Sequence, residues 1–161
     1  MNKEYIKALS PEALFERGKS FIDLERWNQV AVSQRMRLVT LLADGITVLS
    51  DFSKGWDWVV ERPVISADQF PVEPEQRQRV LAAAIPILQG LSGENHPAGA
   101  VVQAKLDELN QSLDFGKGFG KSKGIVLKTL RYALTGEQHG PALAEVVGIL
   151  GLKKCLERLV V

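Results

Sequence analysis

The sequence predicts an all-α protein, a bundle of about eight helices in two small subdomains. Apolar residues recur three and four positions apart along most of the chain, which is the period of a helix with one buried face. No segment alternates apolar and polar residues over the length of a strand. Helix start and stop signals bound several segments, such as Ser10 followed by Pro11 and, much later, Gly136.

Three helices are expected in the first subdomain, residues 1–62. They cover residues 10–22, 27–43 and 47–62, and the last of them ends before a proline. Trp58 falls off the apolar stripe of its helix, so it is either a packing edge or an exposed contact. The residues expected to face inward are Leu14, Phe15, Phe21, Ile22, Val32, Met36, Val39, Leu42, Val48, Phe52, Trp56, Val59 and Val60.

A proline-rich connector, residues 63–73, leads into the second subdomain, residues 74–161. The helices expected there cover residues 75–91, 100–114, 122–136, 140–151 and 152–160. Pro86 lies inside the first of them and predicts a break or kink just before it, because proline removes a backbone donor and crowds the preceding turn. Pro141 is expected at the first position of its helix, where proline is tolerated.

The composition is that of an ordinary globular protein, with 45% apolar and 24% charged residues among 161. The formal net charge is +1, so any nucleic-acid binding must depend on a local patch. The single cysteine, Cys155, excludes an intrachain disulfide and is typical of a reducing compartment. There is no membrane span and no signal peptide, so we expect a cytoplasmic monomer without a membrane partner.

The stretch FGKGFGKSKG, residues 115–124, invites comparison with a phosphate-binding loop. Such a loop needs a glycine five positions before Gly120, and Phe115 stands there, with Gly116 one position late. The preceding residues have a helical period, whereas a phosphate-binding loop follows a buried strand. The spacing therefore argues against a nucleoside triphosphate site.

No other constellation indicates catalysis or a cofactor. His96 and His139 lie in separate turns, and Cys155 is far from both in sequence, so no metal site is predicted. No nucleophile elbow is present. The chain by itself is therefore expected to have no cofactor and no enzymatic activity.

Residues 115–131 form a basic stretch without any acidic residue. Lysines on a glycine-rich loop beside an arginine on a helix suit a phosphodiester backbone, because the loop supplies point charges and the arginine a fixed fork. A solvated basic loop without a ligand is the alternative. The cations of this stretch are Lys117, Lys121, Lys123, Lys128 and Arg131.

A short turn between two helices follows, from Gly136 to Pro141. The unpaired N–H groups of a helix start carry partial positive charge, and Gly140 has no side chain to block a flat ring. Pro141 and Leu143 offer apolar contact, so the turn could receive an unstacked RNA base. The alternative is a plain helix–turn–helix corner with His139 in solvent.

The segment Leu127–Leu159 resembles the C-terminal end of bacterial-type glutamyl-tRNA synthetase, a class I aminoacyl-tRNA synthetase. That family carries an Arg-x-Ala-Leu-Thr-Gly turn, then typically His-Gly-Pro, then a helix and a leucine-rich closing helix. The segment Met1–Leu14 is similar to its Asn-x-x-Tyr-Ile-x-x-Leu-Ser-Pro-Glu segment. The matching residues are Arg131, Ala133, Leu134, Thr135, Gly136, His139, Gly140, Pro141, Leu143 and Gly151.

The resemblance implies a helical domain that holds the anticodon loop of tRNA-Glu. By this resemblance Arg131, Gly140, Pro141 and Leu143 would lie against anticodon bases, with His139 at the rim. Lys128 stands where the family often has a polar contact residue.

Two departures from the family pattern limit this expectation. The class I catalytic domain is absent from the sequence, so glutamate activation would need such a domain in cis or in trans. An arginine that reads the anticodon in some members is replaced by Gly45. The alternative is therefore a stand-alone relative that has lost RNA binding and acts as a protein-interaction or regulatory module.

Overall fold

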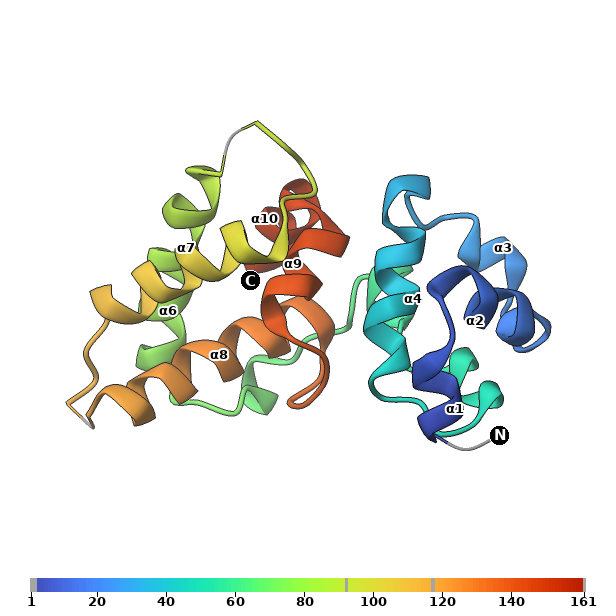
Figure 1. Cartoon of the computed structure of the whole chain (residues 1–161). Coiled ribbons are helices and arrows are strands. Elements are labelled where there is room, and N and C mark those ends of the chain that lie inside the picture. The colour runs from blue at the N-terminus through green and yellow to red at the C-terminus, as the bar shows by residue number, and fades with distance from the viewer. Residues whose placement is uncertain (1–2, 92, 117, 161) are drawn as a thin grey trace. The chain divides into compact units, whose positions relative to one another are not determined.

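The computed structural model describes residues 3–91, 93–116 and 118–160 (Figure 1). Over these residues it contains ten α-helices, four short 3-10 turns and no strand, so the predicted all-α class is confirmed. The chain divides into two compact units, Met1–Glu61 and Arg62–Val161. Each unit is described by itself.

The first unit has a small aromatic core. Trp27 stacks on Phe15 with 5.1 Å between ring centroids and meets Trp56 edge to face at 5.7 Å. A Cβ on Gly18 would lie 2.5 Å from the Phe52 ring, so glycine lets this ring approach the backbone closely. The helices are α1 (Lys3–Ala8), α2 (Pro11–Gly18), α3 (Leu24–Trp27), α4 (Arg35–Ala43) and α5 (Asp57–Val60).

Local capping in this unit follows the sequence, but the predicted helix lengths are wrong. Ser10 caps α2, since its Oγ accepts a hydrogen bond from the Ala13 N–H at 3.2 Å. The helix expected over 27–43 is split by an irregular segment, which leaves Val32 76% exposed. The helix expected over 47–62 is broken at Gly55, whose φ of 84° is left-handed.

The expected inward face of the first unit is also corrected at Phe21 and Val48, and the alternative left open for Trp58 is decided. Phe21 and Val48 lie on 3-10 or extended backbone and are 45% and 44% exposed. Trp58 is buried, and its Nε1 donates to the Gly55 carbonyl at 2.8 Å, so it is a packing residue. The spacing expected of an unbroken helix misassigns Phe21 and Val48, because neither lies on a regular α-helix.

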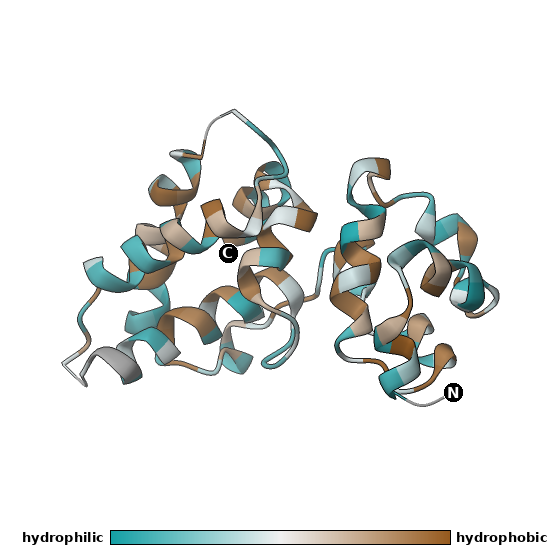
Figure 2. Ribbon diagram, in the orientation of Figure 1, coloured by the Kyte–Doolittle hydropathy of each residue, from teal (hydrophilic) through white to brown (hydrophobic). Residues whose placement is uncertain are grey.

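The second unit is built around its longest helix, α8, which contacts α6, α7, α9 and α10. In Figure 2 α6, α7 and α8 carry both apolar and polar residues along their length, as amphipathic helices do, whereas α9 is apolar apart from Glu145. Pro86 lies inside an unbroken α6, so of the expected break or kink the break does not occur. Pro86 and Ala82 are exposed, so water can reach the Ala82 carbonyl, which the proline leaves without its helical donor. The helices are α6 (Pro74–Gln89), α7 (Gly99–Ser112), α8 (Phe119–Thr135), α9 (Leu143–Leu150) and α10 (Leu152–Leu159).

The junction between α9 and α10 is closed by the loop that precedes α7. The Asn95 carbonyl accepts from the Leu152 N–H at 2.7 Å, and Asn95 Oδ1 accepts from the Lys153 N–H at 3.0 Å. Gly151 has a left-handed φ of 86°, and a Cβ there would lie 2.7 Å from Asn95 Nδ2, so this junction favours glycine. The first free N–H groups of α10 are thus satisfied by a residue far away in the sequence.

Candidate nucleic-acid interface

The turn between α8 and α9 begins at a left-handed glycine. Gly136 has a φ of 74°, and its N–H donates to the Tyr132 carbonyl at 2.8 Å, which ends α8 as predicted. A Cβ at this position would lie 2.8 Å from Pro63 Cβ. The direction in which the chain leaves α8 is therefore fixed by both backbone conformation and packing.

The Thr135 side chain holds Glu137, the residue that follows Gly136. Its Oγ1 donates to the Arg131 carbonyl at 2.8 Å and accepts from the Glu137 N–H at 3.1 Å. One hydroxyl therefore joins the last turn of α8 to the start of the connecting segment. The far end of that segment differs from the prediction, because α9 begins at Leu143 and not at Pro141.

Arg131 holds the other end of the turn. Its Nη1 donates a hydrogen bond to the Pro141 carbonyl oxygen. A Cβ on Gly140 would lie 3.7 Å from the same nitrogen, so the guanidinium lies close alongside the glycine. Burial lowers the pKa of Arg131 from its ordinary value, although an arginine remains charged at neutral pH. A fixed positive charge is thus built into the turn.

A groove of about 370 Å³ runs beside this charge. Lys128 and His139 on its wall are exposed, and neither has an ion-pair partner among the described residues. Since Lys128 precedes Arg131 by three residues on α8, both side chains lie on the same face of the helix. The residues that line the groove include Leu127, Lys128, Arg131, Gln138, His139 and Gly140.

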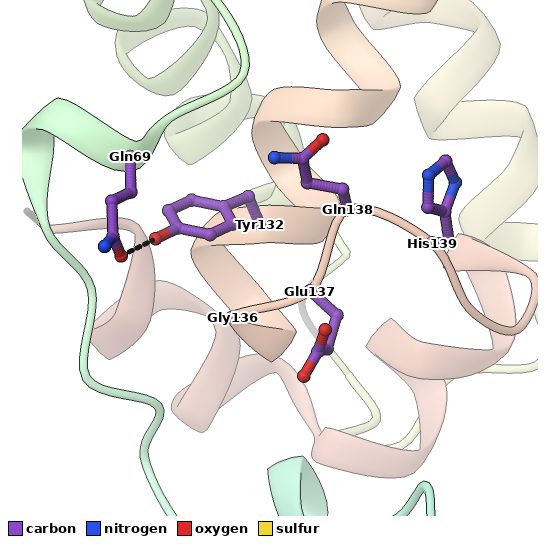
Figure 3. A pocket seen from close by; sticks show the side chains of 6 residues that line it. All are labelled: Gln69, Tyr132, Gly136, Glu137, Gln138 and His139. Carbon is purple, nitrogen blue, oxygen red and sulfur yellow. Dashed lines mark hydrogen bonds between the residues drawn. The ribbon is translucent and has the colours of Figure 1, made fainter.

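A second hollow, of about 560 Å³, is lined by residues of the same turn (Figure 3). The Tyr132 hydroxyl donates to Gln69 Oε1 at 3.2 Å and forms one wall. Gln138 and His139 line both hollows, so this dipeptide stands between them. Gln138 is part of the motif quoted above, whereas no pattern in the sequence singled out Gln69, which comes from the connector.

Three of the predicted binding residues lie elsewhere, and a fourth is outside the described residues. Leu143 is only 4% exposed, so its side chain packs in the core and offers no surface for a base. Lys121 and Lys123 lie in the first turns of α8 and not on a loop, and neither lines the groove. Lys117 lies outside the described residues. Arg131, Lys128, His139 and Gly140 are brought together as expected, and Pro141 joins them through its carbonyl.

The helical fold is of the kind found in a known family of domains. Residues 13–160 match the family described as an anticodon binding domain, and the chain belongs to that family. Its matched curated relatives are glutamate–tRNA ligases. The Thermus thermophilus enzyme is 29% identical over 164 residues, which are 99% of this chain and 32% of the relative. The Synechococcus enzyme is 29% identical over 93% of this chain and 31% of the relative.

Solved structures agree on the fold. A glutamate tRNA ligase from Elizabethkingia meningosepticum superimposes with a TM-score of 0.72 at 17% identity, over 98% of this chain and 30% of that one. The enzyme from Elizabethkingia anophelis gives 0.67 at 16% identity. The chain thus spans about a third of its relatives' length and corresponds to their anticodon-binding portion. In the part that the structure describes, none of the helices could cross a membrane.

Proposed function

We propose that this chain binds the anticodon loop of a tRNA, and that tRNA-Glu is its ligand. The observation that carries the proposal is the turn held by the hydrogen bond from Arg131 to Pro141, with a groove beside it walled by exposed Lys128 and His139. Single-stranded RNA loops are read by splayed bases that stack on protein surfaces and hydrogen-bond through their edges. A rigid turn beside a cationic groove provides both kinds of contact.

The residues of the groove would make different kinds of contact with the RNA. Lys128 is an exposed point charge suited to a phosphate, which positions the RNA without reading its sequence. Arg131 uses one of its five N–H donors on the turn and keeps others for a base edge. Gly140 presents bare backbone, and His139 is an exposed ring on which a base can stack.

Glutamate activation is not assigned to the residues described here. The curated relatives are about three times as long as the segment that matches this chain. We propose that a class I catalytic domain, in cis or in trans, supplies the ligase chemistry when this module presents its tRNA. The module itself contributes binding.

Gly45 favours a second candidate function, a protein-interaction or regulatory role without RNA. The residue stands where the resemblance places an anticodon-reading arginine, and a net charge of +1 gives the chain little general attraction to RNA. This candidate predicts a stable fold that binds no tRNA.

A filter-binding titration separates the two functions. The wild-type chain should bind tRNA-Glu more tightly than a tRNA-Glu with a substituted anticodon, and raising the salt should weaken both complexes. Lys128→Ala should lower affinity for both RNAs alike and reduce the slope against log salt by about one. Lys105→Ala is the control, because this lysine lies on α7, outside the groove, and pairs with Glu108.

The outcomes are distinct. Discrimination between the two tRNAs that depends on the groove supports anticodon binding. Equal affinity for both RNAs that disappears with salt would show only a basic surface, and no binding at all would favour the protein-interaction role.

A further inference from the structure

A glycine stands inside α8 at a position where the protein does not require one. Gly124 lies within the helix and has helical backbone. A Cβ built on it would have no neighbour within 4 Å, in contrast to Gly18, where an aromatic ring occupies that space. Glycine is among the least favourable residues for a helix interior, and alanine would stabilise the same turn. Neither backbone conformation nor packing within the described residues therefore explains this glycine.

Gly124 is part of the wall of the groove beside the turn. The same wall includes Lys128 and Arg131, which follow it by about one and two turns of α8. Because glycine has no side chain, the helix backbone itself forms the groove surface at this point. A ligand in the groove can approach the helix more closely here than it could over a longer side chain.

Lys121 extends the same face of the helix beyond the groove. It is exposed but does not line the groove. At about 100° per residue, Lys121, Gly124, Lys128 and Arg131 lie within about 80° of one another around α8. Arg131 follows Lys121 by ten residues, which is about 15 Å along the helix axis. We call these four residues the basic stripe.

The positive charges of α8 are not balanced within the helix. Its sequence contains four cations and no acidic residue. Lys128 and Arg131 stand three positions apart, so they repel each other. On α7, by contrast, Lys105 pairs with Glu108 at 2.9 Å over the same spacing. Neither Lys121 nor Lys128 has an ion-pair partner in the part of the chain that the structure describes, so an anionic ligand would relieve the repulsion.

We propose that the basic stripe binds the phosphate backbone of single-stranded RNA, and that Gly124 lacks a side chain so that the strand can lie against the helix. Lysines suit this contact because they act as point charges on phosphates without reading a base. A stripe of about 15 Å is long enough for more than one phosphate. The inference rests on the proposed function, since the strand would be the part of the tRNA loop that continues from the bases at the turn.

The test compares the stability and the RNA binding of Gly124 variants. Gly124→Ala should raise the thermal midpoint, because alanine favours a helix, and should nevertheless weaken binding of tRNA-Glu. Gly124→Leu should also have a raised midpoint and should lower the affinity roughly tenfold or more, the loss expected when a charge-assisted contact is removed. Lower affinity together with a higher midpoint cannot result from a damaged fold.

Added bulk alone is controlled on another helix. Ala100 is an exposed residue of α7 outside the groove, so Ala100→Leu should bind tRNA-Glu normally. Unchanged affinity in Gly124→Leu would overturn the proposal.

A matched pair of lysines tests the path of the strand. Lys121→Ala should lower the affinity and reduce the slope of log affinity against log salt by about one. Lys123→Ala removes the same charge from a different face of α8, about 160° from Lys121, and should leave the slope unchanged. Equal effects of the two substitutions would indicate attraction by net charge alone and would contradict the stripe.

Anticodon preference separates this proposal from the function on which it rests. A phosphate contact carries no sequence information, so Gly124→Leu should weaken the complexes with tRNA-Glu and with the substituted-anticodon tRNA equally. Anticodon preference with normal binding by Gly124→Leu would overturn the stripe and leave the proposed function standing, whereas no tRNA binding by the wild-type chain would overturn both. Poly-glutamate that displaces tRNA as well as a single-stranded RNA of equal charge would assign the stripe to an acidic protein and overturn the RNA assignment.

Discussion

The Arg131 guanidinium donates a hydrogen bond from Nη1 to the Pro141 carbonyl oxygen, across the turn that joins α8 to α9. The arginine therefore supports the shape of the turn as well as its charge. The resemblance to the synthetase family implied contact between this residue and anticodon bases. The geometry adds that the same side chain positions the backbone that those bases would meet.

Replacing Arg131 should weaken tRNA binding through this support. A hydrogen bond from a charged group contributes about 1.5–3 kcal/mol, so Arg131→Ala should reduce affinity for tRNA-Glu by roughly 10- to 100-fold. Hydrogen exchange at the amides of residues 137–140 should become faster, which loss of a base contact alone would not produce. Arg131→Lys keeps a charge and one donor and should recover part of both effects.

Arg17→Ala serves as the charge control for this experiment. Arg17 lies over the Tyr5 ring in the first unit, so its removal changes the net charge equally without touching the turn. Unchanged hydrogen exchange in Arg131→Ala would contradict the supporting role.

Gly136→Ala should destabilise the second unit. An alanine in the left-handed conformation costs about 1–2 kcal/mol, and its Cβ would also press on Pro63. Thermal or urea unfolding measures the loss. Adding Pro63→Gly removes the crowding but not the conformational cost, so the double variant should be more stable than the sum of the single changes predicts.

Gly45→Ala is the matched control for Gly136→Ala. A Cβ at Gly45 would have the Leu42 carbonyl oxygen as its nearest neighbour, at 3.8 Å, so the substitution should change stability by no more than about 0.5 kcal/mol. A large loss at Gly45, or none at Gly136, would contradict this account of the turn.

Gly45→Arg tests whether base reading was weakened at this position. The site is exposed and spacious, so an arginine can be accommodated without displacing its neighbours. If the anticodon loop binds as proposed, the variant should discriminate better against substituted anticodons, by roughly 5- to 100-fold for one bidentate base contact of about 1–3 kcal/mol. Competition binding with the two tRNAs measures the ratio, and Gly45→Lys controls for added charge. Equal gains for both tRNAs would indicate charge alone.

Cys155 should be unreactive while the chain is folded. Burial raises the pKa of its thiol from 9.0 to about 12, and Sγ donates to the Val147 carbonyl. Alkylation with iodoacetamide at about pH 8 should therefore be slow until denaturant is added, because the thiolate is the nucleophile. Mass spectrometry follows the modified fraction. Rapid modification of the native chain would contradict the burial.

The same pKa has a consequence for stability. Between pH 9.0 and about 12 the unfolded chain loses the thiol proton while the folded chain keeps it. Fewer protons are then bound in the unfolded state, so the thiol's contribution to stability is complete below this range and is lost as the pH rises through it. Cys155→Ala should show a shallower loss of stability over the same range.

Features set by local chemistry were predictable from the sequence. Ser10 caps α2 and Gly136 ends α8, because each needs only its neighbours along the chain to act. The break at Gly55 was not predicted, because the apolar period continues across it. The spacing of apolar residues shows which face of a helix would be buried. A left-handed glycine within the segment can change the direction of the backbone without altering that spacing.

The convergence of several candidate residues beside one turn was predictable, but the contacts among them were not. Lys128, Arg131 and His139 converge because the motif is continuous in sequence. The bond from Arg131 to the Pro141 carbonyl depends on the path of the turn, and the contribution of Gln69 depends on tertiary packing, so neither has a sequence signal.

Asn95 has a consequence for the order in which the molecule assembles. This residue completes the start of α10 from the loop before α7, across 58 positions of sequence. The first N–H groups of α10 therefore depend on water until that loop has docked. The start of α10 therefore depends on a contact with a residue far away in the sequence. A substitution of Asn95 should first increase the mobility of the backbone at Leu152 and Lys153.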